Sequence, residues 1–237
     1  MMRVLVVRGS GAAGRRGSLL DGEEHHLKVR RAEDGAAVEV RDGEGLVGRG
    51  RLIRQGKGWF VEVTEFRQAA KPEELTLAVG AGDRDRFEWV VEKATELGVT
   101  SVIPLETERT AGVASRVRPQ HLDRLRRQAL EAVKQSGAAW ATLVEAPLSL
   151  GDLAGRPVAG RRWVADASGG AVPAVVGTEP LTVVVGPEGG LTAAELEQLR
   201  DAGYAPVRLG PHTLRFETAA IAAAAAAVAG RLRGSDG

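Results

Sequence analysis

The residues best suited to chemistry lie in a short segment near the end of the chain, Leu214-Arg215-Phe216-Glu217-Thr218. It sets a guanidinium and a carboxylate two residues apart, at the entry to an alanine-rich run that is predicted to be helical. A guanidinium can orient a planar substrate and stabilise an anion, and a carboxylate can accept a proton or hold the guanidinium in place. The alternative is a salt bridge or a helix cap, with Thr218 as the capping residue.

A glycine-rich turn, Gly186-Pro187-Glu188-Gly189-Gly190, precedes this segment and follows the apolar run 181–185. Glycine lets a backbone come close to a ligand with its N–H groups free to bond, so the turn can cradle a small polar molecule. A strand-to-helix turn that needs glycine only for its geometry explains the same residues. Thr192 and Glu195 have the spacing of a capping box, which predicts that a helix begins at Thr192.

Both loops follow predicted strands, 181–185 and 207–209, and ligands of open α/β sheets bind beyond the carboxyl ends of strands. Strands and helices alternate from residue 75 to 230, which predicts a largely parallel sheet covered by helices. Asp83 is the expected cap of one helix, and Pro119 is the expected first residue of another that runs to about Gln135. The other predicted strands are 75–79, 99–105 and 162–165, the predicted last helix is 219–229, and residues 142–160 are predicted to be rich in loops.

The first part of the chain has a different pattern. Strands are predicted at 3–7, 37–41, 46–54 and 59–64, with turn signals such as Asp42-Gly43 between them. This spacing is typical of a small β-barrel. A loop is expected from 8 to 18, and Asp21 is expected to cap a short helix. The segment 69–74 reads as a linker, so we place one domain at 1–70 and a second at 71–237.

Composition limits the class of protein. The 237 residues include no cysteine, which excludes disulfides and thiolate metal sites. The longest apolar run, 219–229, is shorter than the roughly 20 residues that span a bilayer. With no apolar signal segment at the start, these features predict a cytoplasmic protein without a membrane partner. Residues 1–70 hold 13 Lys and Arg against 10 Asp and Glu, a slight basic excess that agrees with a nucleic-acid partner.

The densest positive patch is predicted on and before the helix that starts at Pro119. RNA phosphate contact and a solvated helix face both explain such a patch. Its members are Arg109, Arg116, Arg118, Arg124, Arg126, Arg127 and Lys134. The pair His25-His26 raises the question of a metal, but neighbouring helical residues point about 100° apart and no third ligand is near in sequence. We therefore expect no metal site.

Several motifs together resemble the bacterial 16S ribosomal RNA (uracil-N3)-methyltransferase family of the SPOUT superfamily. The resemblance rests on short motifs that occur in order across nearly the whole chain. They are Val185-Gly-Pro-Glu-Gly-Gly190, Leu209-Gly-Pro-His-Thr-Leu-Arg-Phe-Glu-Thr-Ala219, His25-His26-Leu27 with Val29-Arg30-Arg31, Glu92-Lys93-Ala94-Thr95-Glu96-Leu97-Gly98-Val99, Pro104 with Glu108-Arg109-Thr110, and Glu131-Ala-Val-Lys-Gln-Ser136. One departure is visible: Gly137-Ala138-Ala139 stands where the family often has an arginine.

The resemblance implies a two-domain α/β protein. A PUA-like, RNA-binding β-barrel would precede a SPOUT domain with a trefoil knot, and the knot would form the interface of a homodimer. S-adenosylmethionine would be held by the two loops, with Asp166–Ser168 as a less certain third wall. The cofactor-binding residues that this implies are Gly186, Pro187, Glu188, Gly189, Leu209, Gly210 and Leu214.

The implied activity is methylation of N3 of a uridine in 16S ribosomal RNA, with the small ribosomal subunit as partner. Arg215 would orient the uracil and stabilise its anion, and Glu217 would be either the base or the residue that orients Arg215. We expect RNA contacts from Arg30, Arg31, Arg109 and Arg127. Two alternatives stay open: a SPOUT enzyme with another RNA target, and a non-catalytic RNA-binding protein of ribosome assembly.

Overall fold

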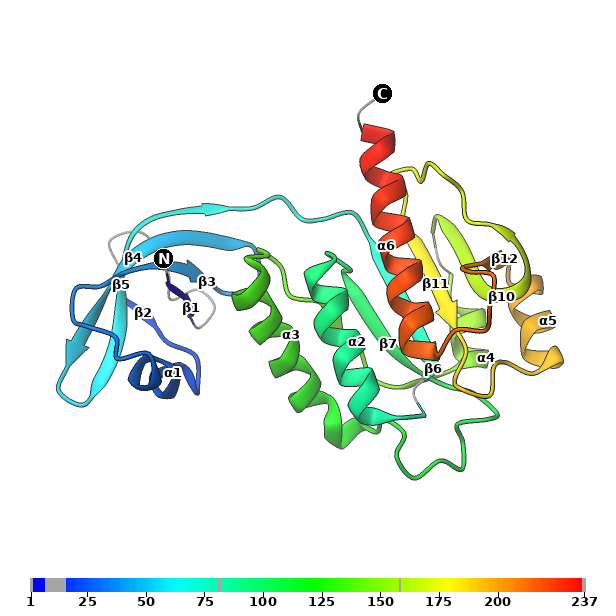
Figure 1. The fold of residues 1–237 in the computed structure, drawn as a ribbon, viewed down its shortest axis with the longest axis horizontal. Coiled ribbons are helices and arrows are strands. Elements are labelled where there is room, and N and C mark those ends of the chain that lie inside the picture. Colours follow the sequence, from blue (N-terminus) through cyan, green and yellow to red (C-terminus); the bar gives the residue numbers. More distant parts are fainter. Residues whose placement is uncertain (1, 7–15, 81, 158, 236–237) are drawn as a thin grey trace. The chain divides into compact units, whose positions relative to one another are not determined.

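The computed structural model describes residues 2–6, 16–80, 82–157 and 159–235 (Figure 1). The chain forms two compact units. The first consists of Met1–Pro72 together with Leu130–Ala141, and the second of Glu73–Ala129 together with Thr142–Gly237. The predicted domain ranges name an RNA-binding and a methyltransferase domain, which this division does not test. The predicted boundary near residue 71 places residues 130–141 in the second domain, whereas in the structure they pack with the first unit.

The first unit is built on a five-stranded sheet in the order β1-β3-β4-β5-β2. Strand β1 runs parallel to β3, and the other pairs are antiparallel. The segment at the end of β1 also pairs with the segment that follows β2. Val6 forms a bridge with Leu19, and Leu20 N donates to Leu5 O at 3.0 Å. The strands are β1 (Met2–Leu5), β2 (Arg16–Ser18), β3 (Ala37–Arg41), β4 (Leu46–Gln55) and β5 (Gly58–Gln68).

Two local predictions in this unit are wrong. Residues 16–18 form strand β2 instead of a loop, because they pair with β5. Helix α1 (Glu23–Val29) is not capped by Asp21: its N-cap is Gly22, in the left-handed conformation with φ 91° and without a side-chain cap. Arg8 and Arg15 of the predicted loop, and the last residue of the predicted strand 3–7, lie outside the described residues. The core lies between the sheet and α1, with Leu27, Val38 and Leu52 fully buried.

The second unit contains the expected parallel sheet, in the order β12-β10-β11-β6-β7-β8 with β9 beside β7. Every pair in it is parallel, so its carboxyl ends share one edge. Strand β10 is longer than predicted and continues past a register shift between Ala165 and Gly170. The strands are β6 (Leu75–Gly80), β7 (Ser101–Glu106), β8 (Leu143–Val144), β9 (Leu148–Ser149), β10 (Arg161–Ala171), β11 (Leu181–Val185) and β12 (Ala205–Arg208).

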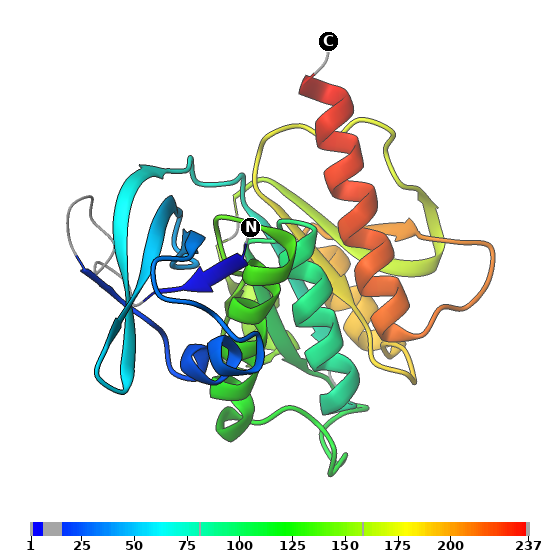
Figure 2. The ribbon, with the colours of Figure 1, turned by 60° about the vertical axis from the view of Figure 1, so that its left-hand side comes forward.

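Helices cover both faces of this sheet (Figure 2). On one face, α4 and α5 bury Leu153 and Leu199 against Ile103, Val164 and Val184. On the other, α6 lies along β6 and β11 and packs against α2. The helices are α2 (Arg84–Glu96), α3 (Leu122–Ser136, after a 3-10 turn at Pro119–His121), α4 (Leu150–Gly155), α5 (Ala193–Asp201) and α6 (Phe216–Ser235). Within the described residues, none of these helices is long and apolar enough to cross a membrane.

A predicted helix start is confirmed where the capping side chain bonds backbone groups two or three residues further on. The Asp83 carboxylate accepts from Asp85 N and Arg86 N, both at 3.0 Å, and so starts α2 as predicted. Helix α6 starts at Phe216, earlier than predicted, so Thr218 lies inside its first turn and is not its cap. The segment 142–160, predicted to be rich in loops, contains the short elements β8, β9 and α4.

Candidate functional site

The second unit has a cavity of about 400 Å³, which we call the main cavity. Both loops singled out in the sequence line it, and they follow β11 and β12 at the carboxyl edge of the sheet. This volume lies in the range of small-molecule sites. The lining residues are Ala165, Asp166, Ala167, Val185, Gly186, Pro187, Glu188, Gly190, Leu191, Leu196, Arg208, Leu209, Gly210, Pro211, His212, Thr213, Leu214, Phe216 and Ala219.

All but one of the residues predicted to hold a cofactor line the main cavity. The exception is Gly189, where an added Cβ would lie 3.0 Å from Cδ of Arg109, so this glycine makes room for an arginine. Of the possible third wall, Asp166 and Ala167 line the cavity. Ser168 does not line it, and its backbone N–H donates to Asp166 Oδ1 at 2.8 Å.

Two glycines, one ending β6 and one just after it, leave room for the first loop. A Cβ at Gly80 would lie 2.6 Å from the ring and the backbone nitrogen of Pro187, and one at Gly82 would lie 2.6 Å from Glu188 Oε2. The distance to Pro187 is too short for a real carbon contact, so a side chain at Gly80 would require the loop to shift, whereas the Glu188 carboxylate beside Gly82 can move aside. Close packing against the first loop therefore explains the glycine at position 80.

The capping box at the start of α5 also fixes a neighbouring turn. Thr192 Oγ1 accepts from Glu195 N at 3.3 Å, and Glu195 Oε2 accepts from Thr192 N at 2.8 Å, as the sequence predicts. The other carboxylate oxygen of Glu195 accepts from Glu108 N at 2.8 Å. This bond holds the turn that presents Arg109, whose exposed side chain passes Gly189 and Gly190 beside the main cavity.

The two predicted catalytic residues, Arg215 and Glu217, do not line the main cavity, although Leu214 and Phe216 do. Arg215 is exposed. The side chain of Glu217 is 15% exposed, and its Oε1 accepts from Nη1 of Arg86 at 3.3 Å. Its Oε2 is buried without a hydrogen-bond partner in the described part of the chain.

Arg86 was missed in the sequence. It lies in the first turn of α2, where its place after the Asp83 cap gives no sign of a partner 131 positions away. Only the packing of α2 against α6 brings the two helix starts together. The local spacing of Arg215 and Glu217 had suggested a pair between them, but the ion pair of Glu217 is with Arg86.

The four arginines predicted to contact RNA are all exposed, two in each unit. Arg30 is the C-cap of α1, and Arg31 follows it with a φ of 50°. In the second unit, Arg109 lies beside the main cavity, and Arg127 on α3 donates from Nε to Asp123 O at 3.4 Å. Exposure and positive charge are what phosphate contact requires.

A histidine lies in the basic part of the second unit. Backbone Arg118 N donates to Nδ1 of His121 at 3.1 Å. Partial burial, with the positive charges of Arg84, Arg118 and Arg124, lowers the pKa of His121 below its ordinary value. Both causes disfavour the protonated ring, so His121 is neutral at physiological pH.

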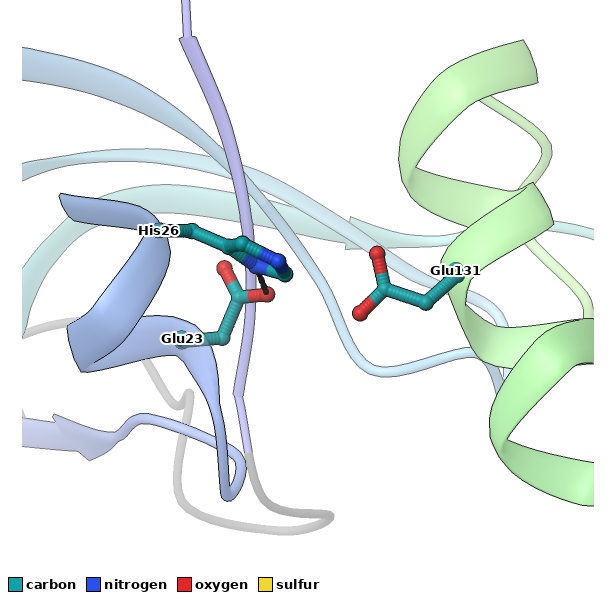
Figure 3. A group of neighbouring side chains, drawn as sticks. All are labelled: Glu23, His26 and Glu131. Carbon is teal, nitrogen blue, oxygen red and sulfur yellow. Dashed lines mark hydrogen bonds and ion pairs between the residues drawn. The ribbon is translucent and has the colours of Figure 1, made fainter. Parts of the chain in front are cut away.

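Contrary to the expectation from sequence, a possible third metal ligand does lie near His26 in space. No third ligand lies near His26 in sequence, but in the structure ligand atoms of Glu23, His26 and Glu131 all lie within 4.8 Å of one another (Figure 3). Glu131 comes from α3, which sequence spacing cannot reveal. The Nζ atom of Lys134 lies 2.5 Å from Glu23, 2.9 Å from Glu131 and 2.9 Å from His26. An ammonium therefore supplies the positive charge among these ligands.

Comparison with known proteins identifies the class to which this fold and cavity belong. The family described as RNA methyltransferase domain matches residues 69–228, which is more than half of the chain. Residues 69–228 therefore belong to the RNA methyltransferase domain family.

Individual relatives narrow this class. Ribosomal RNA small subunit methyltransferase E of Aquifex aeolicus (strain VF5) is 33% identical over 215 residues, which cover 87% of this chain and 93% of that protein. The protein of the same name from Synechocystis sp. (strain ATCC 27184 / PCC 6803 / Kazusa) is 32% identical, covering 85% of this chain and 69% of that protein. The chain belongs to the family of ribosomal RNA small subunit methyltransferase E, which confirms the resemblance seen in the sequence.

Solved structures agree over nearly the whole length. The crystal structure of ribosomal RNA small subunit methyltransferase E from Neisseria gonorrhoeae, bound to S-adenosyl methionine, matches with a TM-score of 0.84 and 27% identity. It covers 95% of this chain and 96% of that one. A probable rRNA-methyltransferase from Porphyromonas gingivalis matches with a TM-score of 0.78 and 28% identity, covering 94% and 95%.

Proposed function

We propose that this protein transfers a methyl group from S-adenosylmethionine to N3 of a uridine in 16S ribosomal RNA of the small ribosomal subunit. The observation that carries the proposal is the main cavity, which the Gly186–Gly190 and Leu209–Leu214 loops line together. The related protein from Neisseria gonorrhoeae has S-adenosyl methionine bound. A ribosomal substrate also implies a cytoplasmic protein.

The residues of the main cavity suit S-adenosylmethionine. Backbone groups of the two loops can bond its adenine and its amino acid part, and Leu209, Leu214 and Phe216 offer apolar surface to the adenine ring. Asp166 and Glu188 bring carboxylates that suit its positively charged centres. When bound, this molecule supplies an activated methyl group.

The chain must also activate the uracil. N3–H of uracil is a weak acid, and its loss spreads negative charge over O2 and O4, so a positive group at that place lowers the barrier. Arg215 is the proposed group, because it is exposed and lies in sequence between Leu214 and Phe216, which both line the main cavity. Glu217 was proposed as base or as orienting residue, and its ion pair with Arg86 supports a positioning role at the start of α6.

Arg215→Ala tests this assignment. We expect the variant to bind S-adenosylmethionine in calorimetry like the wild type but to lose methylation of small subunits that lack the modification. The matched control is Arg200→Ala, which removes an exposed arginine from the last turn of α5 and should leave both properties unchanged. Methylation by Arg215→Ala at the wild-type rate would show that the assignment is wrong.

The reaction product decides between the proposed function and its alternatives. Nucleoside mass spectrometry of treated RNA, followed by mapping, should show methylation of N3 of a uridine in 16S RNA. A methylated tRNA base or ribose would indicate another target. Failure to bind S-adenosylmethionine would instead indicate a non-catalytic role in ribosome assembly.

The proposal includes a PUA-like RNA-binding barrel in the first unit and a trefoil knot in the second. For the barrel, the support is the bridge from Val6 to Leu19, which joins the ends of the sheet. For the knot, the support is the path of the chain after β12. Strand β12 lies at the sheet edge, but helix α6, which follows it, lies along the inner strands β6 and β11. The connection between β10 and β11 also meets α6, since Val176 N donates to Gly230 O at 3.1 Å.

We also propose a homodimer that α6 helps to form. Ile221, Ala225 and Val228 lie on one side of α6, and each is only half-buried in the single chain. An apolar stripe of this kind on a helix is expected to be covered by another surface.

A further inference from the structure

A nearly buried ammonium group joins α1 to the last turn of α3 in the first unit. The side chain of Lys134 is 10% exposed, and its Nζ lies 2.5 Å from Glu23 Oε1, 2.9 Å from Glu131 Oε2 and 2.9 Å from His26 Nδ1. An ammonium has three N–H donors and no acceptor, so these three acceptors match its whole capacity. Lys134 thus holds the two carboxylates and the histidine around one positive charge.

This arrangement decides which nitrogen of His26 carries the proton. Because lysine can only donate, the ring atom at 2.9 Å from Nζ, which is Nδ1, must accept. Nδ1 also lies 3.4 Å from Glu23 Oε1, and a proton on Nδ1 could be donated to that oxygen. The ammonium is nearer to Nδ1, at 2.9 Å, and already donates to the same oxygen, so a proton on Nδ1 would meet the ammonium and be repelled. The neutral ring therefore carries its proton on Nε2, which makes Nε2–H the group that His26 can offer to a ligand.

His26 faces a small cavity of about 160 Å³ in the first unit, which we call the α1 cavity. Arg30, Arg3 and Lys134 also line it, so it is rich in positive groups. The side chain of His26 is 47% exposed, and Arg30 follows it by four residues on the same face of α1. Arg3 is fixed there, because its Nη1 donates to Gln135 O at 2.8 Å.

The acidic groups of the α1 cavity are already engaged. Glu23 is buried and bonds Lys134 as well as the backbone N–H of Leu5, and Glu131 pairs with Lys134. Their charge is therefore directed at the ammonium. Arg30 and the Nε2–H of His26 remain to meet a ligand, and a positive charge beside a neutral donor suits a phosphate oxygen.

We propose that the α1 cavity binds a phosphate of the RNA backbone, with His26 Nε2–H and Arg30 as donors. In this proposal Lys134 is a positioning residue, which keeps His26 in the tautomer that donates from Nε2. The proposal rests on the proposed function, because it takes RNA as the ligand.

Two substitutions of His26 separate its two nitrogens. Glutamine places an amide N–H near the position of Nε2, whereas asparagine reaches only the position of Nδ1. We expect His26→Asn to weaken binding of the full chain to 16S RNA at fixed salt by about tenfold, as for loss of one bond to a charged group. His26→Gln should bind within about twofold of the wild type, because it keeps that bond. Equal affinities of the two variants would overturn the proposal.

His25 provides the matched control, because it is the neighbouring exposed histidine and does not line the α1 cavity. His25→Asn should leave the affinity for RNA unchanged. A loss as large as that of His26→Asn would show that the effect is not specific to the cavity, and would also overturn the proposal.

The role of Lys134 is tested by nitrogen NMR of the histidine rings. Removing the ammonium alone would leave the buried Glu23 carboxylate without the positive charge that balances it, so the variant is the double substitution Glu23→Gln with Lys134→Met. We expect the wild type to show the Nε2–H tautomer of His26 and the double variant to show both tautomers with weaker RNA binding. An unchanged tautomer in the double variant, or a shift of His26 Nδ1 in the wild type on adding Zn²⁺ alone, would overturn this role.

The outcomes also separate this inference from the proposed function. If the wild type methylates 16S RNA but the His26 variants bind it equally, only the inference fails. If the wild type binds 16S RNA and methylates no uridine, the proposed function fails, while the comparison of His26→Asn with His26→Gln still tests the α1 cavity.

Discussion

Arg31 has a backbone conformation that glycine adopts more easily than other residues. Its φ is 50°, and it stands just after α1, where Arg31 N donates to Lys28 O at 3.1 Å and Ala32 N to Leu27 O at 2.9 Å. This is the Schellman ending, in which glycine is the usual residue. An arginine here costs the fold about 1 kcal/mol. RNA contact, proposed above, would give a reason to keep it.

Arg31→Gly should therefore stabilise the protein by up to about 1 kcal/mol and weaken RNA binding. Arg30→Gly removes the same charge one residue earlier, where φ is −82°, and should destabilise the protein by roughly 0.5–1 kcal/mol. Chemical denaturation and RNA titration of both variants test this. A loss of stability in Arg31→Gly would contradict the conformational argument.

His121 gives a prediction about pH. Burial and the charges of Arg84, Arg118 and Arg124 lower its pKa in the folded protein, so near the ordinary histidine pKa of about 6.5 the unfolded chain binds a proton more readily than the folded protein does. This group therefore lowers stability as the pH falls from 6.5 towards its folded pKa. Arg118→Ala should raise the pKa of His121 in an NMR titration.

Arg126→Ala is the control for this titration, because Arg126 pairs with Asp123 and is not among the causes of the shift. It should leave the pKa of His121 unchanged. Equal effects of the two substitutions would mean that general positive charge, and not the neighbours of His121, sets its pKa.

Residues of the site that local sequence signals mark were predicted, and residues that depend on distant partners were not. The loop residues of the main cavity were found because glycine and proline at strand ends limit the backbone locally. Arg86 and Glu131 were missed because their partners, Glu217 and the pair Glu23 with His26, come from distant segments. Spacing along the chain contains no record of such contacts.

At the scale of elements, caps that act within a few residues were predicted and tertiary pairing was not. Asp83 and Thr192 start their helices as expected, since the acceptor and its N–H partners are neighbours. Strand β2 was not predicted because it depends on pairing with β5, which is distant in sequence. The N-cap of α1 is Gly22, in the left-handed conformation, and not the expected Asp21. Alternation of strands and helices was enough to predict the parallel sheet.

Gly80, the last residue of β6, packs closely against Pro187 of the first loop, and this contact predicts the effect of Gly80→Ala. The new Cβ would meet Pro187 at 2.6 Å, so the loop must shift. Overpacking of this kind costs about 1–3 kcal/mol. We expect weaker S-adenosylmethionine binding in calorimetry.

Gly112→Ala is the control for Gly80→Ala, because it adds the same methyl group in the second unit where nothing lies within 4 Å. It should bind S-adenosylmethionine like the wild type. If Gly80→Ala also binds like the wild type, the loop tolerates displacement and its close packing does not set the affinity.

At the scale of the whole molecule, the alanine-rich α6 is the element whose surface a single chain explains least. Ala225→Glu places a charge in its half-buried apolar stripe and should shift the protein from dimer to monomer in sedimentation. Ala194→Glu makes the same change at an exposed position of α5 and should leave the assembly unchanged. A dimer that persists in Ala225→Glu would place the interface elsewhere.

The division of the chain into units has a consequence for chimeric genes. The first unit is discontinuous: residues 130–141 belong to it although they follow much of the second unit in sequence. A chimera that exchanges only residues 1–72 with a relative would transfer Glu23 and His26 but leave the recipient's counterpart of Lys134 in place. Recombination between relatives is therefore expected to preserve function when both segments come from one parent.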